Sequence, residues 1–400
     1  LQNIMAFAAE PLSVGGTCYF YLNTDSALTN VIWTGPLALA SNAVFNVNRA
    51  GGVGKASLID MQGAITGAGA LTKTDTNTVL MLSGASDFSG GTTLNSGVLK
   101  LGSATGLGSG PVTLTSGWLD LNGVGATIGS LSSTTNGVIV DFSAGTGTNT
   151  LTVNQAVAGT ASGTISNGLN RTLAFTKTGA GILTLAATNT FQGQVTVNGG
   201  TLRMGVAASL TNNPSTFVIN SGGTLDLYSQ SLNYNSRTVV IAGPGASGQS
   251  GALVNTANGA EAQVFNLTLS GAATIGSTGN KLNVYGTLNG GGNVLSVGGT
   301  GEINIRPNNA FVNLAGVTVN SGLFRLESNQ GWTGTLRSSL VRSSAVGGAP
   351  CASAAPAGSI SAAASMAARH PSICPIIALP HPARRRGQSA AHTMPRSASP

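Results

Sequence analysis

The chain has 400 residues, of which 58 are glycine, only 7% are charged and 5% are aromatic. This composition excludes an ordinary globular core with a charged shell, and the closely spaced glycines exclude long helices, because each interior glycine costs a helix roughly 1 kcal/mol. The net charge of +7 arises in residues 337–400, which hold seven of the 18 basic residues and none of the 11 acidic ones, so the preceding 336 residues are formally neutral and offer no basic stripe for nucleic acid.

The first part of the chain lacks both a targeting segment and a nucleotide-binding motif. Residues 1–11 have neither the basic start nor the apolar stretch of a signal peptide, so we expect a fragment whose export signal lies upstream. The Gly51–Ala56 segment begins like a phosphate-binding loop. However, Arg49 stands where the first glycine is needed and Ala56 where Ser or Thr is needed, so we reject that interpretation.

The most informative feature is a pattern that occurs three times. The copy over residues 67–102 contains Thr-Lys-Thr, Val-Leu-Met-Leu, Phe-Ser-Gly and then Leu-Asn-Ser-Gly-Val-Leu-Lys-Leu-Gly. Residues 172–205 repeat it in the same order, with Thr-Lys-Thr-Gly-Ala-Gly-Ile-Leu-Thr-Leu, Phe-Gln-Gly and Val-Asn-Gly-Gly-Thr-Leu, and residues 316–326 hold a partial copy. The unit is longer than this motif, because Leu119–Leu121 and Leu225–Leu227 both read Leu-Asp-Leu further downstream.

Each copy reads as strands of three to five residues separated by corners of the Asn-Gly and Gly-Gly type. Such corners also occur in hairpins, but strands this short would give a meander weak ladders. A parallel solenoid instead stacks each strand on its counterpart in the next turn, about 4.8 Å away. At roughly 20 to 25 residues per turn, we expect on the order of 15 turns and a rod about 70 Å long.

The repeats resemble the autotransporter-associated β-strand repeat, closely over residues 172–205 and well over 67–102. With the partial copy, the resemblance covers about a fifth of the chain. The first copy has Asp75–Asn77 where the family prefers Gly-Ala-Gly, plus one extra residue, which we interpret as a loop variation. The resemblance implies an all-β, right-handed parallel β-helix that is exported through an outer-membrane β-barrel to the surface of a Gram-negative-type bacterium.

The composition changes abruptly at Arg337, where Asn, Lys, Asp, Glu and all aromatic residues give way to Ala, Ser, Pro, Arg and His. We therefore predict a repeat-built β-helix over residues 1–336 and a basic, low-complexity segment over 337–400. A disordered linker and translation of a GC-rich gene in the wrong frame both predict this amino-acid composition. The segment shows no alternating ten-residue strands with aromatic girdles, so we expect the barrel translocator to be absent from it.

The repeat region offers little to catalysis or metal binding. All three histidines lie beyond residue 337, so a Ser-His-Asp arrangement is excluded, and Cys18 is the region's only cysteine. A disulfide framework is not predicted, although oxidation of one pair among Cys18, Cys351 and Cys374 stays open. The Gly298–Ile303 segment begins like a calcium-binding repeat, but Ile303 replaces the ligand aspartate. We predict no catalytic, cofactor-binding or metal-binding residues.

Asp120 and Asp226 are the carboxylates that most resemble a catalytic pair, because they occupy equivalent repeat positions. About a hundred residues separate them, which places them roughly 20 Å apart at the rung spacing of a solenoid. Carboxylates of glycosidases lie about 5 to 10 Å apart. Because each is flanked by leucines, we expect both aspartates to point to solvent.

Two further sets of residues recur at matching positions of the repeats. The first set consists of basic residues, namely Lys73, Lys100, Lys177 and Arg203. They could form a basic ladder along one face, or they could discourage edge pairing between strands, and we favour the second role. Phe88 and Phe191 could be exposed platforms for sugars or could stack inside the coil, and we favour the interior.

We therefore expect a surface-exposed structural or adhesive passenger that performs no catalysis and whose partners are host-cell or glycan ligands. One alternative is a fragment of a carbohydrate-active β-helix enzyme, which predicts charged residues clustered on adjacent turns. The sequence shows no such cluster on adjacent turns. A second alternative is a passive stalk without a ligand, and a binding assay would distinguish the stalk from the adhesin.

Overall fold

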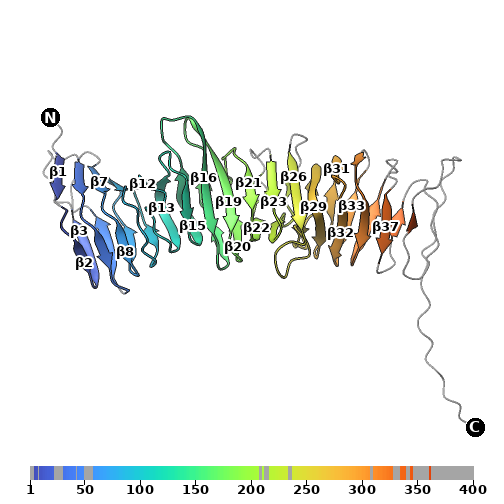
Figure 1. Cartoon of the computed structure of the whole chain (residues 1–400), viewed down its shortest axis with the longest axis horizontal. Coiled ribbons are helices and arrows are strands. Elements are labelled where there is room, and N and C mark those ends of the chain that lie inside the picture. The colour runs from blue at the N-terminus through green and yellow to red at the C-terminus, as the bar shows by residue number, and fades with distance from the viewer. Residues whose placement is uncertain are drawn as a thin grey trace, which may run out of the picture.

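The computed structural model describes residues 4–7, 9–21, 30–41, 43–48, 57–206, 210, 216–232, 237–306, 310–327, 334–338, 343–345 and 360–361. Across these residues the regular structure is entirely β, and none of them forms a helix suited to crossing a membrane. The strands wind into an elongated solenoid of about 13 turns (Figure 1). The predicted parallel β-solenoid is confirmed, with slightly fewer turns than the estimate from repeat length.

One large sheet runs along the rod and contains most of the strands. In chain order they are β1 (Ile4–Phe7), β3 (Thr17–Tyr21), β4 (Asn30–Trp33), β6 (Val44–Asn48), β7 (Ser57–Met61), β9 (Ala70–Lys73), β10 (Thr78–Leu82), β11 (Thr92–Leu94), β12 (Val98–Leu101), β13 (Val112–Asp120), β14 (Ala126–Ile128), β15 (Leu131–Val140), β16 (Gly147–Asn154), β17 (Gly159–Ala161), β18 (Thr164–Ile165), β19 (Arg171–Thr178), β20 (Ile182–Leu185), β21 (Val195–Val197), β22 (Gly200–Met204), β23 (Thr216–Ile219), β24 (Gly223–Asp226), β26 (Thr238–Gly243), β27 (Leu253–Asn255), β29 (Asn266–Ser277), β31 (Thr287–Asn289), β32 (Val294–Gly299), β34 (Ala310–Val312), β35 (Gly316–Val319), β37 (Thr335–Ser338) and β39 (Ile360–Ser361).

Two smaller sheets form another side of the coil at its two ends. The N-terminal one contains β2 (Leu12–Val14), β5 (Leu37–Leu39) and β8 (Ile65–Gly67). The C-terminal one contains β25 (Ser231–Leu232), β28 (Ala262–Val264), β30 (Leu282–Val284), β33 (Glu302–Ile305), β36 (Leu323–Leu326) and β38 (Ser343–Ala345).

Equivalent residues of successive turns lie in register. All strand pairs in the described residues are parallel except β37 with β39. Because side chains alternate between the two faces of a strand, stacking in register produces continuous apolar rows inside the coil. One such row, in which every side chain is at most 2% exposed, runs through Ile59, Leu80, Leu99, Leu119, Ile139 and Ile165.

The two repeat phenylalanines belong to this interior. Phe88 is 0% exposed and Phe191 is 1% exposed, which confirms the prediction that they stack inside the coil. The ring of Phe191 lies 5.9 Å from that of Phe175, between centroids, in a tilted arrangement. Phe88 and Phe191 are therefore part of the apolar core, and their rings are not accessible to a sugar.

The coil continues across the composition change at Arg337. Strand β37 includes Arg337 and pairs in register with β35, and β38 pairs in parallel with β36. Most of residues 337–400 lie outside the described part of the chain, as do Cys351, Cys374 and the Gly51–Ala56 segment. The thiol of Cys18 is free.

Candidate functional site

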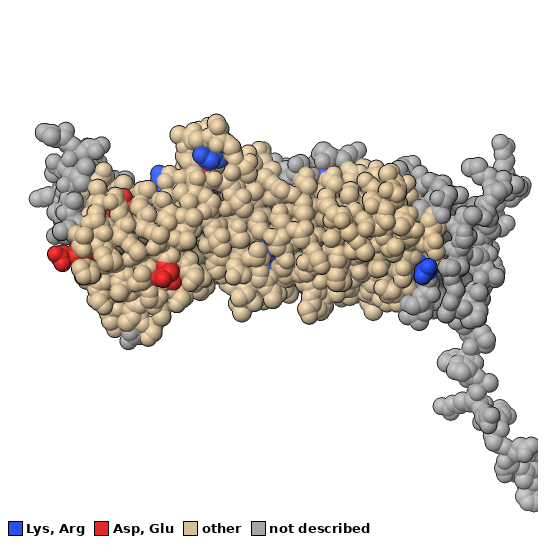
Figure 2. All heavy atoms as spheres, in the orientation of Figure 1, with Lys and Arg blue, Asp and Glu red and all other residues tan. Residues whose placement is uncertain are grey.

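The charged side chains of the C-terminal turns gather on one side of the coil. Every charged residue between positions 238 and 327 is adjacent to or within β28, β30, β33 or β36. We call this surface the charged face, and it contains Glu261, Lys281, Glu302, Arg306, Arg325 and Glu327. By contrast, the side of the rod drawn in Figure 2 carries few charged side chains among the described residues.

Strand pairing explains how residues so far apart in sequence meet. Ala262 pairs with Leu282, which pairs with Ile303, and these buried side chains form an inner row. The alternate positions form an outer row, in which Asn283 pairs with Asn304. Charged residues at the ends of these short strands then stack from turn to turn.

Ion pairs connect the turns of the charged face. Glu261 lies 3.2 Å from Lys281 and 3.2 Å from Arg306, which also lies 3.4 Å from Glu327. A separate pair joins Arg325 to Glu302 at 3.2 Å. Three acids thus meet three bases, so the charged face is neutral as a whole and each carboxylate has a cation beside it.

Two asparagines support these ion pairs. The amide nitrogen of Asn283 donates to Glu261 at 2.9 Å, while its oxygen accepts from Nε of Arg306 at 3.1 Å. The amide nitrogen of Asn304 donates to Glu327 at 2.7 Å. The hydrogen bond from Asn283, together with Lys281 and Arg306, lowers the pKa of Glu261, although partial burial opposes the shift. Glu261 is therefore held ionised.

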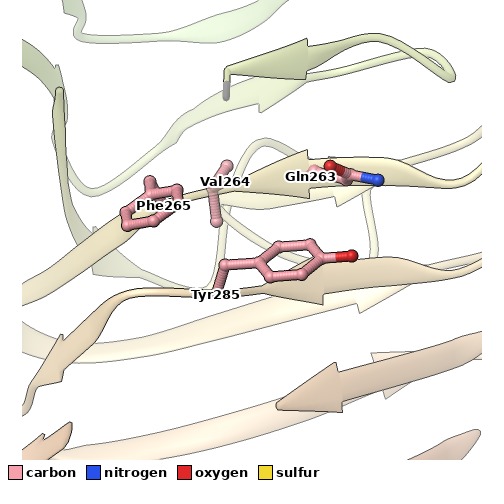
Figure 3. Close-up of a pocket in the computed structure, with 4 residues that line it drawn as sticks. All are labelled: Gln263, Val264, Phe265 and Tyr285. Atoms are coloured by element: carbon pink, nitrogen blue, oxygen red, sulfur yellow. The ribbon is translucent and has the colours of Figure 1, made fainter. Parts of the chain in front are cut away.

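A small aromatic pocket adjoins the charged face at the ends of β28 and β30. The rings of Phe265 and Tyr285 stack with centroids 6.5 Å apart and planes inclined by 15°. The guanidinium carbon of Arg306 lies 5.4 Å from the Tyr285 ring centroid. The pocket is shallow, has a volume of about 260 Å³, and is lined by Gln263, Val264, Phe265 and Tyr285 (Figure 3).

This arrangement corrects the inference that adjacent turns carry no charge cluster. The charged residues are spread over more than sixty positions of the sequence, so they do not form a continuous charged segment. They become neighbours because the strands at 262, 282 and 303 are one turn apart. Applying the turn length to the charged positions, and not only to the apolar ones, would have revealed the cluster.

The geometry does not favour a metal. No cluster of three or more His, Cys, Asp or Glu side chains suited to holding an ion occurs in the part of the chain that the structure describes. Ile303, which occupies the position of a ligand aspartate in the calcium-type motif, is 0% exposed within β33. Its side chain is part of the apolar core.

The repeat lysines form a second unusual arrangement. Lys73 and Lys177 are each 0% exposed. The prediction that they discourage edge pairing between strands is therefore wrong for both, and so is the alternative of a basic ladder along one face. The ammonium of Lys177 donates to the carbonyls of Thr178, Gly179 and Gly199 at 2.8, 2.8 and 3.0 Å, and that of Lys73 donates to the carbonyl of Asp75. These carbonyls lie at the corners where the chain turns between strands, and the lysine satisfies them.

Burial has an electrostatic consequence for both lysines. Removal from water lowers the pKa of Lys73 and of Lys177 to about 8 from the ordinary 10.5. In Lys73 the nearby carboxylate of Asp75 acts in the opposite direction. Both side chains thus satisfy backbone carbonyls at the corners of the coil.

Comparison with known families places these lysines in a named repeat. Residues 71–101 and 175–204 match the model of the passenger-associated-transport-repeat family. The chain carries two passenger-associated-transport repeats. Both lie within the copies at 67–102 and 172–205, so the resemblance to autotransporter passengers is confirmed. Neither a curated protein nor a solved structure matches the chain.

Each passenger repeat is followed by a buried aspartate, which contradicts the prediction that Asp120 and Asp226 face solvent. Asp120 is 3% exposed and Asp226 is 0% exposed. The carboxylate of Asp120 accepts from the backbone N–H groups of Asn122 and Phe142, each at 2.9 Å. Because each aspartate ends its strand, its side chain caps N–H groups at the corner of its own turn and of the next.

The basic residue at the end of each passenger repeat pairs with this aspartate. Lys100 lies 3.7 Å from Asp120, and Arg203 lies 2.9 Å from Asp226. The guanidinium of Arg203 also lies over the ring of Tyr228, 4.6 Å from its centroid. Strand pairing thus assigns the basic residues to cross-turn ion pairs rather than to a free basic ladder.

Proposed function

We propose that the chain is the exported, surface-displayed passenger of an autotransporter-like protein, with a structural or adhesive role and without catalysis. The observation that carries this proposal is the pair of passenger-associated-transport repeats built into one continuous parallel coil. The family of the repeat implies a secreted, surface-associated protein of a Gram-negative bacterium. A rod of stacked turns holds any binding surface away from its point of attachment.

The carbohydrate-active enzyme is the second candidate, because the charged face places three carboxylates on adjacent turns. Glycoside hydrolysis requires one carboxyl that stays protonated, with a raised pKa, beside one that is ionised. In the charged face Glu261 has a lowered pKa, and each of the three carboxylates lies within 3.4 Å of a cation. Glu261 is therefore unsuited to the role of the protonated acid, which supports a non-catalytic role.

Surface display is tested on intact cells of the source bacterium. An antibody raised against residues 57–206 should label unpermeabilised cells, and external protease should remove the signal while a cytoplasmic marker survives. Labelling that requires permeabilised cells would contradict the proposal.

Catalysis is tested separately on the purified chain. Incubation with a panel of plant, bacterial and animal polysaccharides should release no reducing ends or unsaturated products above the level of a Glu261→Gln, Glu327→Gln double variant. Release by the unaltered chain alone would establish the enzyme and overturn the non-catalytic role.

A further inference from the structure

We propose that the pocket formed by Gln263, Phe265 and Tyr285 binds one sugar ring of an uncharged glycan. This inference deepens the proposed function, on which it rests, by giving the adhesive passenger a ligand class and a site. The pocket combines the two kinds of group that sugars require, an aromatic surface and side chains with hydrogen-bond donors and acceptors.

The aromatic surface comes from stacked positions on consecutive turns. Phe265 and Tyr285 follow β28 and β30 directly, so strand pairing fixes them side by side. The C–H groups on one side of a pyranose ring carry partial positive charge and pack against the electron-rich face of an aromatic ring. Both rings line the pocket, and the offset between their centroids leaves part of each turned toward it (Figure 3).

The hydrogen-bonding groups are the side-chain amide of Gln263 and the hydroxyl of Tyr285. Both belong to residues that line the pocket. Neither side chain makes a hydrogen bond to another described residue, in contrast to the equivalent Asn283, whose amide is fully engaged with Glu261 and Arg306. An amide offers both donors and an acceptor, which matches the mixed character of vicinal sugar hydroxyls.

The neighbouring charges decide which glycans fit. Arg306, whose guanidinium carbon lies 5.4 Å from the Tyr285 ring centroid, is already shared by Glu261 and Glu327. A sulfate or carboxylate on a glycan would have to displace one of these partners and would meet the other carboxylate. An uncharged sugar meets no such competition, so the pocket selects against acidic glycans.

The dimensions of the pocket set the mode of binding. A volume of about 260 Å³ is below the roughly 300–1,000 Å³ of pockets that enclose a whole ligand. The pocket is therefore suited to a single ring, and the remainder of the glycan extends along the surface of the rod. Binding of this kind gains strength when many rods contact one polymer.

The test uses the full chain and immobilised linear oligosaccharides of glucose, galactose, mannose and N-acetylglucosamine, with heparin as the acidic comparison. We expect binding to at least one uncharged oligosaccharide, with an affinity that changes less than about twofold between low and moderate salt, because no ion pair forms with the ligand. Absence of binding to every uncharged probe, or binding to heparin alone that salt abolishes, would overturn the proposal.

Variants locate the site. Tyr285→Ala and Gln263→Ala should each weaken binding about tenfold or more, as expected for a central aromatic or amide contact. Tyr285→Phe keeps the ring and should lose less than Tyr285→Ala. Trp118→Ala removes an aromatic side chain that is 49% exposed on distant turns and should leave binding unchanged. Equal losses in Trp118→Ala and Tyr285→Ala would place the site elsewhere.

The result is separable from the proposed function. Surface labelling of cells combined with no glycan binding would reject the pocket alone. Glycan binding by the purified chain combined with intracellular labelling would reject surface display and keep the site.

Discussion

Nε of Arg203 lies 2.9 Å from Oδ2 of Asp226, a carboxylate that is completely buried. The same carboxylate accepts the hydroxyl of Thr256 at 2.6 Å and the backbone N–H groups of Tyr228 and Thr256 at 3.1 and 3.2 Å. One side chain thus joins three successive turns, through β22, the corner after β24 and the corner after β27. This aspartate is therefore a cross-turn staple, which links three turns of the coil through one carboxylate.

Replacing Asp226 with Ala should destabilise the coil by about 3 kcal/mol. The change leaves two partly buried N–H groups, the Thr256 hydroxyl and a partly buried guanidinium without their acceptor, and each such loss is costly. Urea denaturation followed by circular dichroism measures the effect. The control is Asp87→Ala, at an exposed position, which should change stability by less than about 0.5 kcal/mol. Similar midpoints for the two variants would refute the role of Asp226.

The buried lysines predict that stability rises with pH in the alkaline range. In the folded chain Lys73 and Lys177 have a pKa of about 8, below the ordinary 10.5 of the unfolded chain. Between these two pKa values the unfolded chain binds more protons than the folded chain, so the free energy of unfolding increases with pH. Below about pH 8 the lysines are protonated in both states, and the folded chain bears the full cost of burying their charge.

Denaturation at about pH 7.5, 9 and 10 tests this expectation. The Lys73→Met, Lys177→Met double variant should lose the upward slope, and Lys100→Met, which alters a partly exposed lysine, should keep it. The double variant should also be less stable overall, because it leaves corner carbonyls without donors. The prediction is wrong if the double variant and the unaltered chain show the same slope.

Gly97 at the corner of the first passenger repeat should not tolerate a side chain. Its φ is +78°, and an added Cβ would lie 2.2 Å from the carbonyl oxygen of Asp75 and 3.1 Å from the ammonium of Lys73. Gly97→Ala should therefore cost about 2 kcal/mol or more, from strain and from disruption of the lysine contact. Gly125→Ala is the matched control, since its Cβ would meet nothing closer than 3.5 Å. Thermal unfolding of both variants tests this prediction. An equal change in the midpoint temperature of the two variants would contradict it.

The charged face predicts a loss of stability in acid. The pKa of Glu261 in the folded chain is lowered below 4.5, chiefly by the hydrogen bond from Asn283. Its stabilising contribution is therefore present above that pH and disappears as the pH falls through the folded pKa. Glu261→Gln should be less stable near pH 6 by about 1 kcal/mol, and this difference should shrink as the pH falls below 4.5. Parallel stability curves over that range would rule out this contribution.

The solenoid could be predicted because its determinants are local. Two-residue alternation and glycine-containing corners are readable in any short window, and the interior position of Phe88 and Phe191 follows from their place between such strands. The short strands then favoured parallel winding over a meander, in agreement with the resemblance of the two repeats to passenger sequences.

The fate of the polar residues could not be read in the same way. Whether Lys177 or Asp226 is buried depends on which carbonyls or N–H groups the adjacent turn presents, and this requires the exact register between turns. The same holds for the charged face, since Glu261 and Arg306 are 45 residues apart yet share a hydrogen bond. Nothing local in the sequence marks such contacts.

The in-register stacking of equivalent strands has a consequence for how such a rod changes in evolution. Leu80, Leu99 and Leu119 occupy one row, so a gain or loss of about 20 residues inserts or removes one complete rung and leaves matching surfaces on both sides. A gain of a single residue inside a strand would instead turn the apolar side chains that follow it outward. The length of the rod is therefore adjustable only in steps, each about 4.8 Å high, while its cross-section stays constant.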